Sequence, residues 1–327
     1  MADQRLLAIY PVPGNGPSLA SLADSLLEQQ LRSWKMLAAG YEGLGEARLR
    51  EIRPGLLSAF LQFNRKRMAS TGAKVDPASV AARACFLCLH NLPDDQRAVL
   101  YRDDYLLLCN PAPILDHHFT IPHTNHIPQA IAGALETFFA LITDFSPGYT
   151  VFYNGPKCGA SAPDHLHFQA SPSGAIPVET QFRTTEARGL SREVRGGTVT
   201  VFGLPERSAV VLEGPSPDIT RSLLDHLLAT ARKKSGTAEE PMVNLLGWMR
   251  DGACVAIVFL RSKHRPAAYF LEGEDRIVVS PAAVDMGGLI VTPREKDFRR
   301  IDEARAGAIY KEVSIGGEEL NGLVEAL

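Results

Sequence analysis

Residues 149–169 read YTVFYNGPKCGASAPDHLHFQ: an apolar run that ends at Asn154, then a turn of small residues, then His-Leu-His-Phe-Gln. Side chains alternate between the two faces of a β-strand, so a strand over 164–170 would turn its polar side chains to one face and its apolar side chains to the core. The polar face would carry His165, His167 and Gln169, and the apolar face Leu166 and Phe168. The stretch therefore predicts a strand with a chemically active face.

The turn before this strand contains Gly159, Ala160 and Ser161. Little side-chain bulk surrounds their backbone N–H groups, which suits a bound phosphate. The stretch thus places a candidate nucleophile beside a candidate anion site. The alternative is a buried strand whose histidines only satisfy hydrogen bonds in the core.

The composition is that of a globular protein with one large or two modest domains: 327 residues, 45% hydrophobic and 22% charged. A net charge of −3 argues against bulk nucleic-acid binding. No apolar run has the length of a membrane span, and residues 1–16 lack a signal-peptide pattern, so we expect no membrane partner. Five cysteines with one close pair do not resemble a disulfide framework, which indicates a reducing, cytoplasmic context.

Hydrophobic periodicity and turn residues predict the order of the elements. Helices are expected at 18–39, 47–52, 128–143 and 218–234, with further helices from 294 onward. Strands are expected at 60–64, 99–100, 105–109, 118–121, 149–154, 199–202, 208–212, 243–249, 253–260 and 289–292. The polar stretch 172–197 is expected to be a linker or crossover without regular structure.

In the first half the order strand, strand, helix, strand, strand suits an antiparallel sheet with a helix on one face. The second half repeats strand, helix, hairpin and strand in outline, without a detectable sequence repeat. We therefore expect a helical N-terminal segment (1–59), a first unit with the His-x-His-x-Gln array (60–180) and a second unit without it (181–327).

Cys85 and Cys88 have the spacing of a zinc knuckle, in which two thiolates hold one face of the ion and need two further ligands. Histidines follow at His117, His118, His123, His126 and His165. A redox dithiol is the alternative, but it lacks the βαβ context that would support it.

The segment 65–76 reads RKRMASTGAKVD and places four cations in one loop. Beside a phosphate site such a run can clamp a substrate; otherwise it is solvated surface. Lys74, Arg65 and Lys263 are candidates for contacts with distal phosphates, with plain surface charge as the alternative.

Several motifs together resemble the transferase branch of the histidine-triad superfamily. They are NHIPQ at 125–129, YNGPKCGAS at 153–161, DHLHFQA at 164–170, NLLGWMRDGACVAIVFLRSKHRP at 244–266 and VDMGGLIVTPREKDF at 284–298. The chain looks most like the GDP-hexose phosphorylases and the dinucleoside-tetraphosphate phosphorylases (ATP adenylyltransferases), and more distantly like galactose-1-phosphate uridylyltransferase. The similarity covers about residues 60 to 315.

The resemblance implies an α+β, histidine-triad-like fold with two antiparallel-sheet-plus-helix units in one compact body. It implies that His167 is the nucleophile and that Gln169 binds phosphate. Asn154 and Ser161 match positions that orient or cradle the phosphates, together with the rest of the turn. One departure is Asp164, where the GDP-hexose enzymes have Asn.

The cysteine knuckle is a second departure from the GDP-hexose enzymes, which lack it. The uridylyltransferases often hold a zinc ion with two Cys and two His. On that pattern the ligands of a structural zinc would be Cys85, Cys88, His126 and His165, with His123 as the rival of His126.

The implied activity is nucleotidyl transfer or phosphorolysis on a nucleoside diphosphate sugar or a dinucleoside polyphosphate, through a covalent histidine–nucleotide intermediate. A nucleophilic imidazole needs one unprotonated nitrogen, which requires its other nitrogen to donate to a fixed acceptor such as a backbone carbonyl. A glutamine gives no proton and does not activate water, which favours phosphate or a phosphorylated acceptor over water. The partners would be a nucleotide or nucleotide sugar and phosphate. The alternatives are a nucleotide-phosphate hydrolase and a non-catalytic nucleotide-binding protein, and the sequence leaves the oligomeric state open.

Overall fold

The computed structural model describes residues 5–11, 16–68, 72, 75–203, 205–236 and 239–327. The strands are β1 Leu6–Tyr10, β2 Arg48–Ile52, β3 Ala59–Phe63, β4 Ala98–Tyr101, β5 Tyr105–Cys109, β6 Phe119–Pro122, β7 Tyr149–Asn154, β8 His167–Pro172, β9 Arg188–Val194, β10 Gly197–Phe202, β11 Ala209–Gly214, β12 Val243–Arg250, β13 Ala253–Leu260 and β14 Leu289–Thr292. The α-helices are α1 Leu19–Ser33, α2 Lys35–Gly45, α4 Pro77–Ala81, α5 Leu135–Asp144, α6 Val178–Gln181, α7 Pro217–Ser235, α8 Ala283–Met286, α9 Glu295–Arg300, α10 Glu303–Val313 and α11 Gly317–Glu325.

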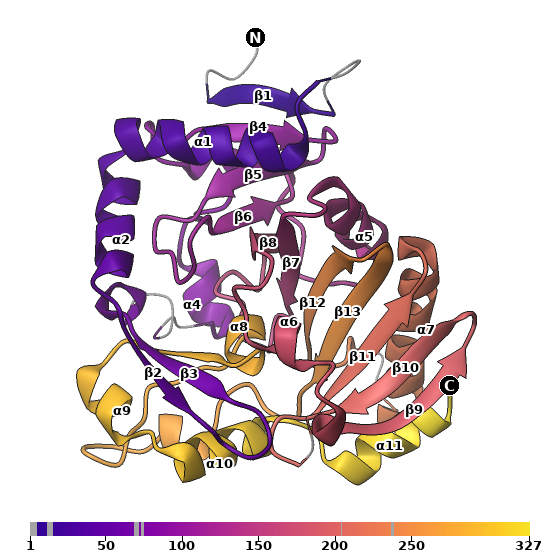
Figure 1. Cartoon of the computed structure of the whole chain (residues 1–327). Helices are drawn as coiled ribbons and strands as arrows, with labels where there is room; N and C mark the ends of the chain where they lie inside the picture. The colour runs from indigo at the N-terminus through magenta and orange to yellow at the C-terminus, as the bar shows by residue number, and fades with distance from the viewer. Residues whose placement is uncertain (1–4, 12–15, 69–71, 73–74, 204, 237–238) are drawn as a thin grey trace.

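One large sheet runs through both halves of the chain (Figure 1). Its 11 strands follow the order β1-β4-β5-β6-β8-β7-β12-β13-β11-β10-β9. The halves meet where β7 pairs antiparallel with β12, with Asn154 opposite Asn244. The stretch 149–169 therefore begins on the strand at the junction between the halves.

The strands at this junction are buried on both faces, because the sheet lies between two layers. Helices α1, α5, α7 and α11 pack on one face, where Val151, Tyr153 and Phe168 join a single apolar core. On the other face, Phe152 belongs to a core with α8, α9 and α10 and with the small sheet β14-β3-β2. The period-two alternation of β7 and β8 thus turns Asn154, His167 and Gln169 toward the second layer.

Local sequence signals explain the best-predicted elements. Helix α7 begins with the side chain of Ser216 accepting the N–H of Ile219, and it ends at Gly236 in the left-handed conformation (φ 67°). The β12–β13 hairpin turns at Asp251 and Gly252, which both have positive φ (51° and 82°), as a two-residue hairpin turn requires.

The α+β class and most strands are confirmed, but several element predictions are wrong. The predicted helix at 47–52 is strand β2, which pairs antiparallel with β3. The segment 1–59 therefore contains strands as well as helices. The predicted helix at 18–39 divides at the buried, extended residue Trp34 into α1 and α2. In each case a tertiary contact overrides a short local pattern.

Three further boundaries differ from the prediction. The helix expected at 128–143 begins only at Leu135, and the stretch 172–197 contains α6 and all of β9 rather than a structureless linker. The strand expected from 164 begins at His167, so His165 lies in the preceding loop. Two strand pairs, β1–β4 and β14–β3, are parallel rather than antiparallel.

Among the described residues, we find no helix that combines the length and the apolar character needed to cross a membrane.

Candidate active site and metal-binding cluster

A cavity of about 420 Å³ lies between first-half strands of the large sheet, including β7 and β8, and the second-half segment 264–291. Its wall includes six of the residues predicted from the sequence: Asn154, Gly159, Ala160, Ser161, His167 and Gln169. The second half of the chain contributes His264, Arg265, Ser280, Ala282, Val284, Asp285 and Val291. The site is therefore built from both halves, although only the first carries the histidine array.

The imidazole of His167 is held in one tautomer. Its Nδ1 lies 2.8 Å from the backbone carbonyl oxygen of His165, and because a carbonyl only accepts, Nδ1 carries the proton. Nε2 is then unprotonated on a side chain that lines the cavity. His167 is 4% exposed, and its burial lowers the pKa of its imidazole to about 4. His167 is thus neutral at physiological pH, as a nucleophile requires.

Gln129 fixes the backbone around His167. Its Nε2 donates to the carbonyl oxygens of Asn154 (2.8 Å) and His167 (3.1 Å), and its Oε1 accepts the N–H of His167 at 2.8 Å. The last residue of the NHIPQ motif therefore ties the ends of β7 and β8 together, a role that the sequence did not predict.

The side-chain amide of Gln169 is oriented by His118. The Nδ1 of His118 accepts the N–H of Ile114 at 3.4 Å, so the Nε2–H of His118 donates to the Oε1 of Gln169 at 2.8 Å. Burial, with the nearby charge of Arg67, lowers the pKa of His118 to about 3, so this ring stays neutral. With its oxygen engaged, Gln169 presents its NH₂ group to the cavity.

The turn at 159–161 approaches the second half of the chain closely. Gly159 has φ +91°, and a Cβ atom there would lie 2.6 Å from the Cβ of Ala282, so both its conformation and its surroundings require glycine. Arg83 donates to the carbonyl oxygen of Ser161 at 2.6 Å and fixes the end of the turn. Within the described part of the chain, the backbone N–H groups of Gly159, Ala160 and Ser161 donate no hydrogen bond to another protein atom.

The cations on the cavity wall differ from those predicted. Lys66, Arg67, Arg83 and Arg265 line it. Arg65 and Lys263 are exposed outside it, and Lys263 pairs with Glu312 at 3.0 Å. Lys74 lies outside the described residues. Arg67 and Arg265 lie two positions after Arg65 and Lys263 in the same basic runs. These runs are therefore the sequence signal that points to both.

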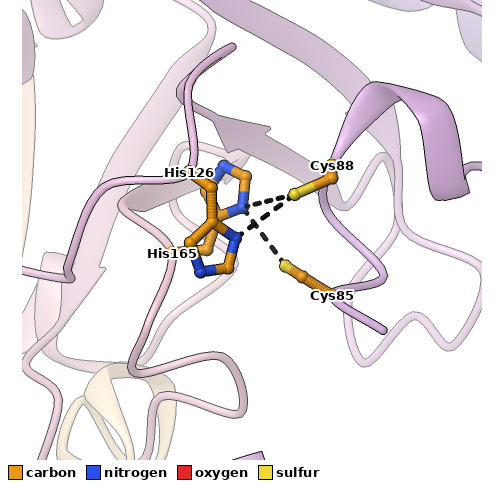
Figure 2. A group of neighbouring side chains, drawn as sticks. All are labelled: Cys85, Cys88, His126 and His165. Carbon is orange, nitrogen blue, oxygen red and sulfur yellow. Dashed lines mark hydrogen bonds between the residues drawn. The ribbon is translucent and has the colours of Figure 1, made fainter. Parts of the chain in front are cut away.

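A second cluster of side chains includes His165, two residues before the start of β8 (Figure 2). It brings together the four predicted ligands Cys85, Cys88, His126 and His165, whose ligand atoms all lie within 4.8 Å of one another. The contacts between Sγ and Nδ1 atoms are 3.2 Å for Cys85–His165 and for Cys88–His126, and 3.6 Å for Cys88–His165. Tetrahedral zinc at about 2.0–2.3 Å from each ligand separates the ligand atoms by about 3.3–3.8 Å. The four residues can therefore hold a metal ion.

The outer nitrogens of both histidines have fixed partners. The Nε2 of His165 donates to the carbonyl oxygen of His123 at 2.7 Å, and the Nε2 of His126 lies 3.3 Å from a carboxylate oxygen of Asp164. Such partners leave Nδ1 as the metal-binding atom and orient the ring. The rival ligand His123 contributes its backbone here, while its Nδ1 accepts the N–H of Asn125 at 2.9 Å.

Comparisons with known proteins bear on the fold. A family model described as a domain of unknown function (DUF4922) matches residues 26–172. No curated protein sequence matches the chain significantly.

The chain resembles solved structures of yeast Ap4A phosphorylase Apa2. One superposes with a TM-score of 0.60 at 14% identity, and the complex with AMP superposes with a TM-score of 0.52 at 16% identity. The complex with Ap4A has a TM-score of 0.50 at 15% identity. Each match covers 89% of this chain and 97% of the Apa2 chain. At these identities the likeness concerns the fold, and this chain therefore shares the histidine-triad-like fold of Ap4A phosphorylase Apa2.

Proposed function

We propose that the protein is a nucleotidyltransferase that acts by phosphorolysis on a nucleoside diphosphate sugar or a dinucleoside polyphosphate, through a covalent nucleotide on His167. The observation that carries this proposal is the 2.8 Å contact between the Nδ1 of His167 and the carbonyl oxygen of His165. It leaves an unprotonated Nε2 on the wall of a cavity that also contains the small-residue turn.

The reaction has two in-line steps. In the first, Nε2 of His167 attacks the α-phosphorus of the substrate; an N–P bond forms, and the P–O bond to the sugar phosphate or nucleoside polyphosphate breaks with its electron pair on the departing oxygen. In the second, an oxygen of inorganic phosphate attacks the same phosphorus, the N–P bond breaks, and a nucleoside diphosphate leaves with a neutral His167 restored.

The donors around His167 suit the charge that develops on the phosphoryl oxygens. Gln169 and Asn154 present NH₂ groups, and the turn presents backbone N–H groups and the hydroxyl of Ser161. Such donors are already in place before the reaction and need no reorganisation during it. Removing one donor of this kind costs about 10²–10³ in kcat in characterised enzymes.

The glutamine determines which substrates fit. A protonated side chain at its position would supply a proton to a poor leaving group, but Gln169 has none to give. Its partner His118 is neutral and already donates its N–H to Gln169. The site therefore suits leaving groups that depart as stable phosphate anions, which favours phosphorolysis over hydrolysis.

The charge of the cavity wall supports a polyphosphate substrate. Lys66, Arg67, Arg83 and Arg265 line it, with Asp285 as the acidic counterpart. A guanidinium group can bind a phosphate through two parallel hydrogen bonds. Several cations on one wall can therefore bind a chain of several phosphates. Apa2, a protein of the same fold, is solved in complex with AMP and with Ap4A, which supports a nucleotide substrate for this site.

Zinc is the metal we assign to Cys85, Cys88, His126 and His165. Two thiolates and two imidazoles are the ligands that zinc takes in structural sites, and four protein ligands leave no position open for water. When bound, zinc would supply cross-linking between the knuckle loop and the loop before β8. The four residues would hold His165 in place, and with it the carbonyl oxygen that sets the tautomer of His167.

Turnover measured with and without phosphate tests the proposal. ATP, GDP-sugars, UDP-sugars and dinucleoside polyphosphates are the substrates to screen, with product analysis by chromatography. We expect turnover to need inorganic phosphate and to give a nucleoside diphosphate. Turnover that is unchanged when phosphate is removed would instead identify a hydrolase, and the transferase assignment would be wrong.

A further inference from the structure

We infer that the second half of the chain, which has no catalytic motif, positions the active-site donor Asn154 through Arg261 and Asn244. This inference rests on the proposed function, because it concerns how one phosphate-binding group is oriented. The three side chains form a relay across the β7–β12 junction, in which each one fixes the direction of the next.

The relay begins at Arg261, which immediately follows β13. This side chain is 4% exposed, and its Nη1 donates to the Oδ1 of Asn244 at 2.7 Å. The guanidinium also donates to backbone carbonyl oxygens, including those of Val313 (3.0 Å) and Pro281 (2.8 Å). Because a guanidinium can only donate, it determines which atom of Asn244 is the oxygen.

The side-chain amide of Asn244, oriented by Arg261, in turn orients the side-chain amide of Asn154. It lies on β12 and is fully buried. With Oδ1 turned to Arg261, its Nδ2 donates to the carbonyl oxygen of Cys158 at 2.7 Å and to the Oδ1 of Asn154 at 2.8 Å. The carbonyl oxygen of Cys158 can only accept, so both ends of the Asn244 amide have unambiguous partners.

The Oδ1 atom of Asn154 accepts two hydrogen bonds. Its Oδ1 accepts from Asn244 and also from the backbone N–H of Ala283 at 2.7 Å. Its Nδ2 has no protein partner among the described residues, and the side chain lines the cavity. Asn154 therefore directs an NH₂ group, and not a carbonyl oxygen, at a bound phosphate. A reversed amide would place a partial negative charge against the phosphate.

All three donors that fix this orientation lie outside the first half. Arg261, Asn244 and Ala283 belong to the second half of the chain, and Asn154 is the last residue of β7 in the first. Asn244 also holds the carbonyl of Cys158, one residue before the small-residue turn. Arg261 and Asn244 are thus positioning residues, which act through Asn154 and do not touch the substrate.

The substitution Asn244→Asp tests the relay. Aspartate keeps the size of the side chain and gives Arg261 a carboxylate partner, but it has no N–H to donate to Asn154. We expect kcat of nucleotidyl transfer to fall about 10- to 100-fold, less than the 10²–10³ for removal of a donor because Asn154 itself remains, with little change in KM. The change Asn321→Asp in α11, outside the cavity wall, is the matched control and should leave kcat unchanged.

A double-mutant cycle separates this role from a general loss of structure. If Asn244 acts through Asn154, adding Asn244→Asp to Asn154→Ala should have little further effect on kcat. Effects that multiply, or a single Asn244→Asp variant with wild-type kcat, would overturn the inference.

A readout without turnover keeps this test distinct from the proposed function. The side-chain NH₂ signal of Asn154 can be followed by ¹⁵N NMR, with Asn154→Ala to assign it. In the wild type we expect fast exchange of these protons with solvent, because the group faces the cavity; in Asn244→Asp, slow exchange, because the group turns to the new carboxylate. Equal exchange in both proteins would contradict the relay even if the enzyme is active, and the predicted difference would support it even if no substrate is turned over.

Discussion

Two atoms of His165 connect His167 to the group of Cys85, Cys88 and His126. The carbonyl oxygen of His165 accepts the Nδ1–H of His167 at 2.8 Å, while the ring Nδ1 of His165 lies 3.2 Å from the Sγ of Cys85 in the metal-binding cluster. A metal ion held by the ring of His165 would therefore restrain the same residue whose carbonyl oxygen sets the tautomer of His167. The candidate metal-binding cluster and the proposed nucleophile are therefore linked through His165.

This coupling predicts the result of removing one ligand. Cys85→Ser should lower bound zinc to well under one ion per chain, lower the melting temperature and reduce kcat, since structural zinc contributes directly to folding free energy. Elemental analysis of protein purified without added zinc measures the first effect. Zinc-free wild-type protein, together with an unchanged melting temperature in Cys85→Ser, would show that the cluster is only a pair of buried thiols beside two histidines.

The contact between His118 and Gln169 gives a second prediction. His118→Phe keeps a ring but removes the donor, so the amide of Gln169 loses its fixed direction and kcat should fall about tenfold, the cost of roughly one hydrogen bond. His118→Gln offers an amide N–H to the same oxygen and should restore part of the rate. Equal rates for the two variants would mean that the ring matters only for packing.

Arg67 and Arg65 form a matched pair for testing the substrate class. Arg67 lines the cavity and donates to the carbonyl of Ala112 at 2.8 Å, whereas Arg65 is exposed outside the cavity. Arg67→Gln should raise the KM for a polyphosphate substrate about 10- to 100-fold, as expected for lost charge-assisted hydrogen bonds. Arg65→Gln should leave KM unchanged. Similar KM values for both variants would argue against phosphate binding at Arg67.

The buried carboxyl group of Glu179 predicts a pH dependence of stability. Burial raises its pKa to about 7, although the hydroxyl of Thr150 and the N–H of Ile176 donate to it. Because the folded state binds this proton more tightly than the unfolded chain, the contribution to stability is full below pH 4.5 and is lost as the pH rises through 7. Relative to Glu179→Gln, the wild type should lose about 2–3 kcal/mol of unfolding free energy between pH 4.5 and 8. Denaturant unfolding of both proteins across this range measures the difference, and parallel curves would contradict it.

Much of the site could be predicted because its residues are close in sequence. The residue two positions before His167 provides the carbonyl, and the knuckle spacing of Cys85 and Cys88 specifies one side of the metal cluster. Periodicity predicted long elements such as α7 and the β12–β13 hairpin, and the family resemblance of the motifs implied the fold class.

What could not be predicted depends on contacts between distant segments. Strand β2 has only five residues, and its pairing with β3 is not encoded in its own pattern. Arg67 rather than Arg65 reaches the cavity because a short 3₁₀ turn sets its direction. Asn244 acquires its partners only when β12 pairs with β7.

The most direct test of the account is the mass of the protein after incubation with a nucleotide substrate and no acceptor. We predict an adduct of one nucleoside monophosphate on the peptide that contains His167, released by mild acid and by inorganic phosphate, and absent from a folded His167→Ala variant. If ATP, GDP-sugars, UDP-sugars and dinucleoside polyphosphates all fail to give an adduct, or if the adduct persists in His167→Ala, nucleotidyl transfer through His167 is contradicted.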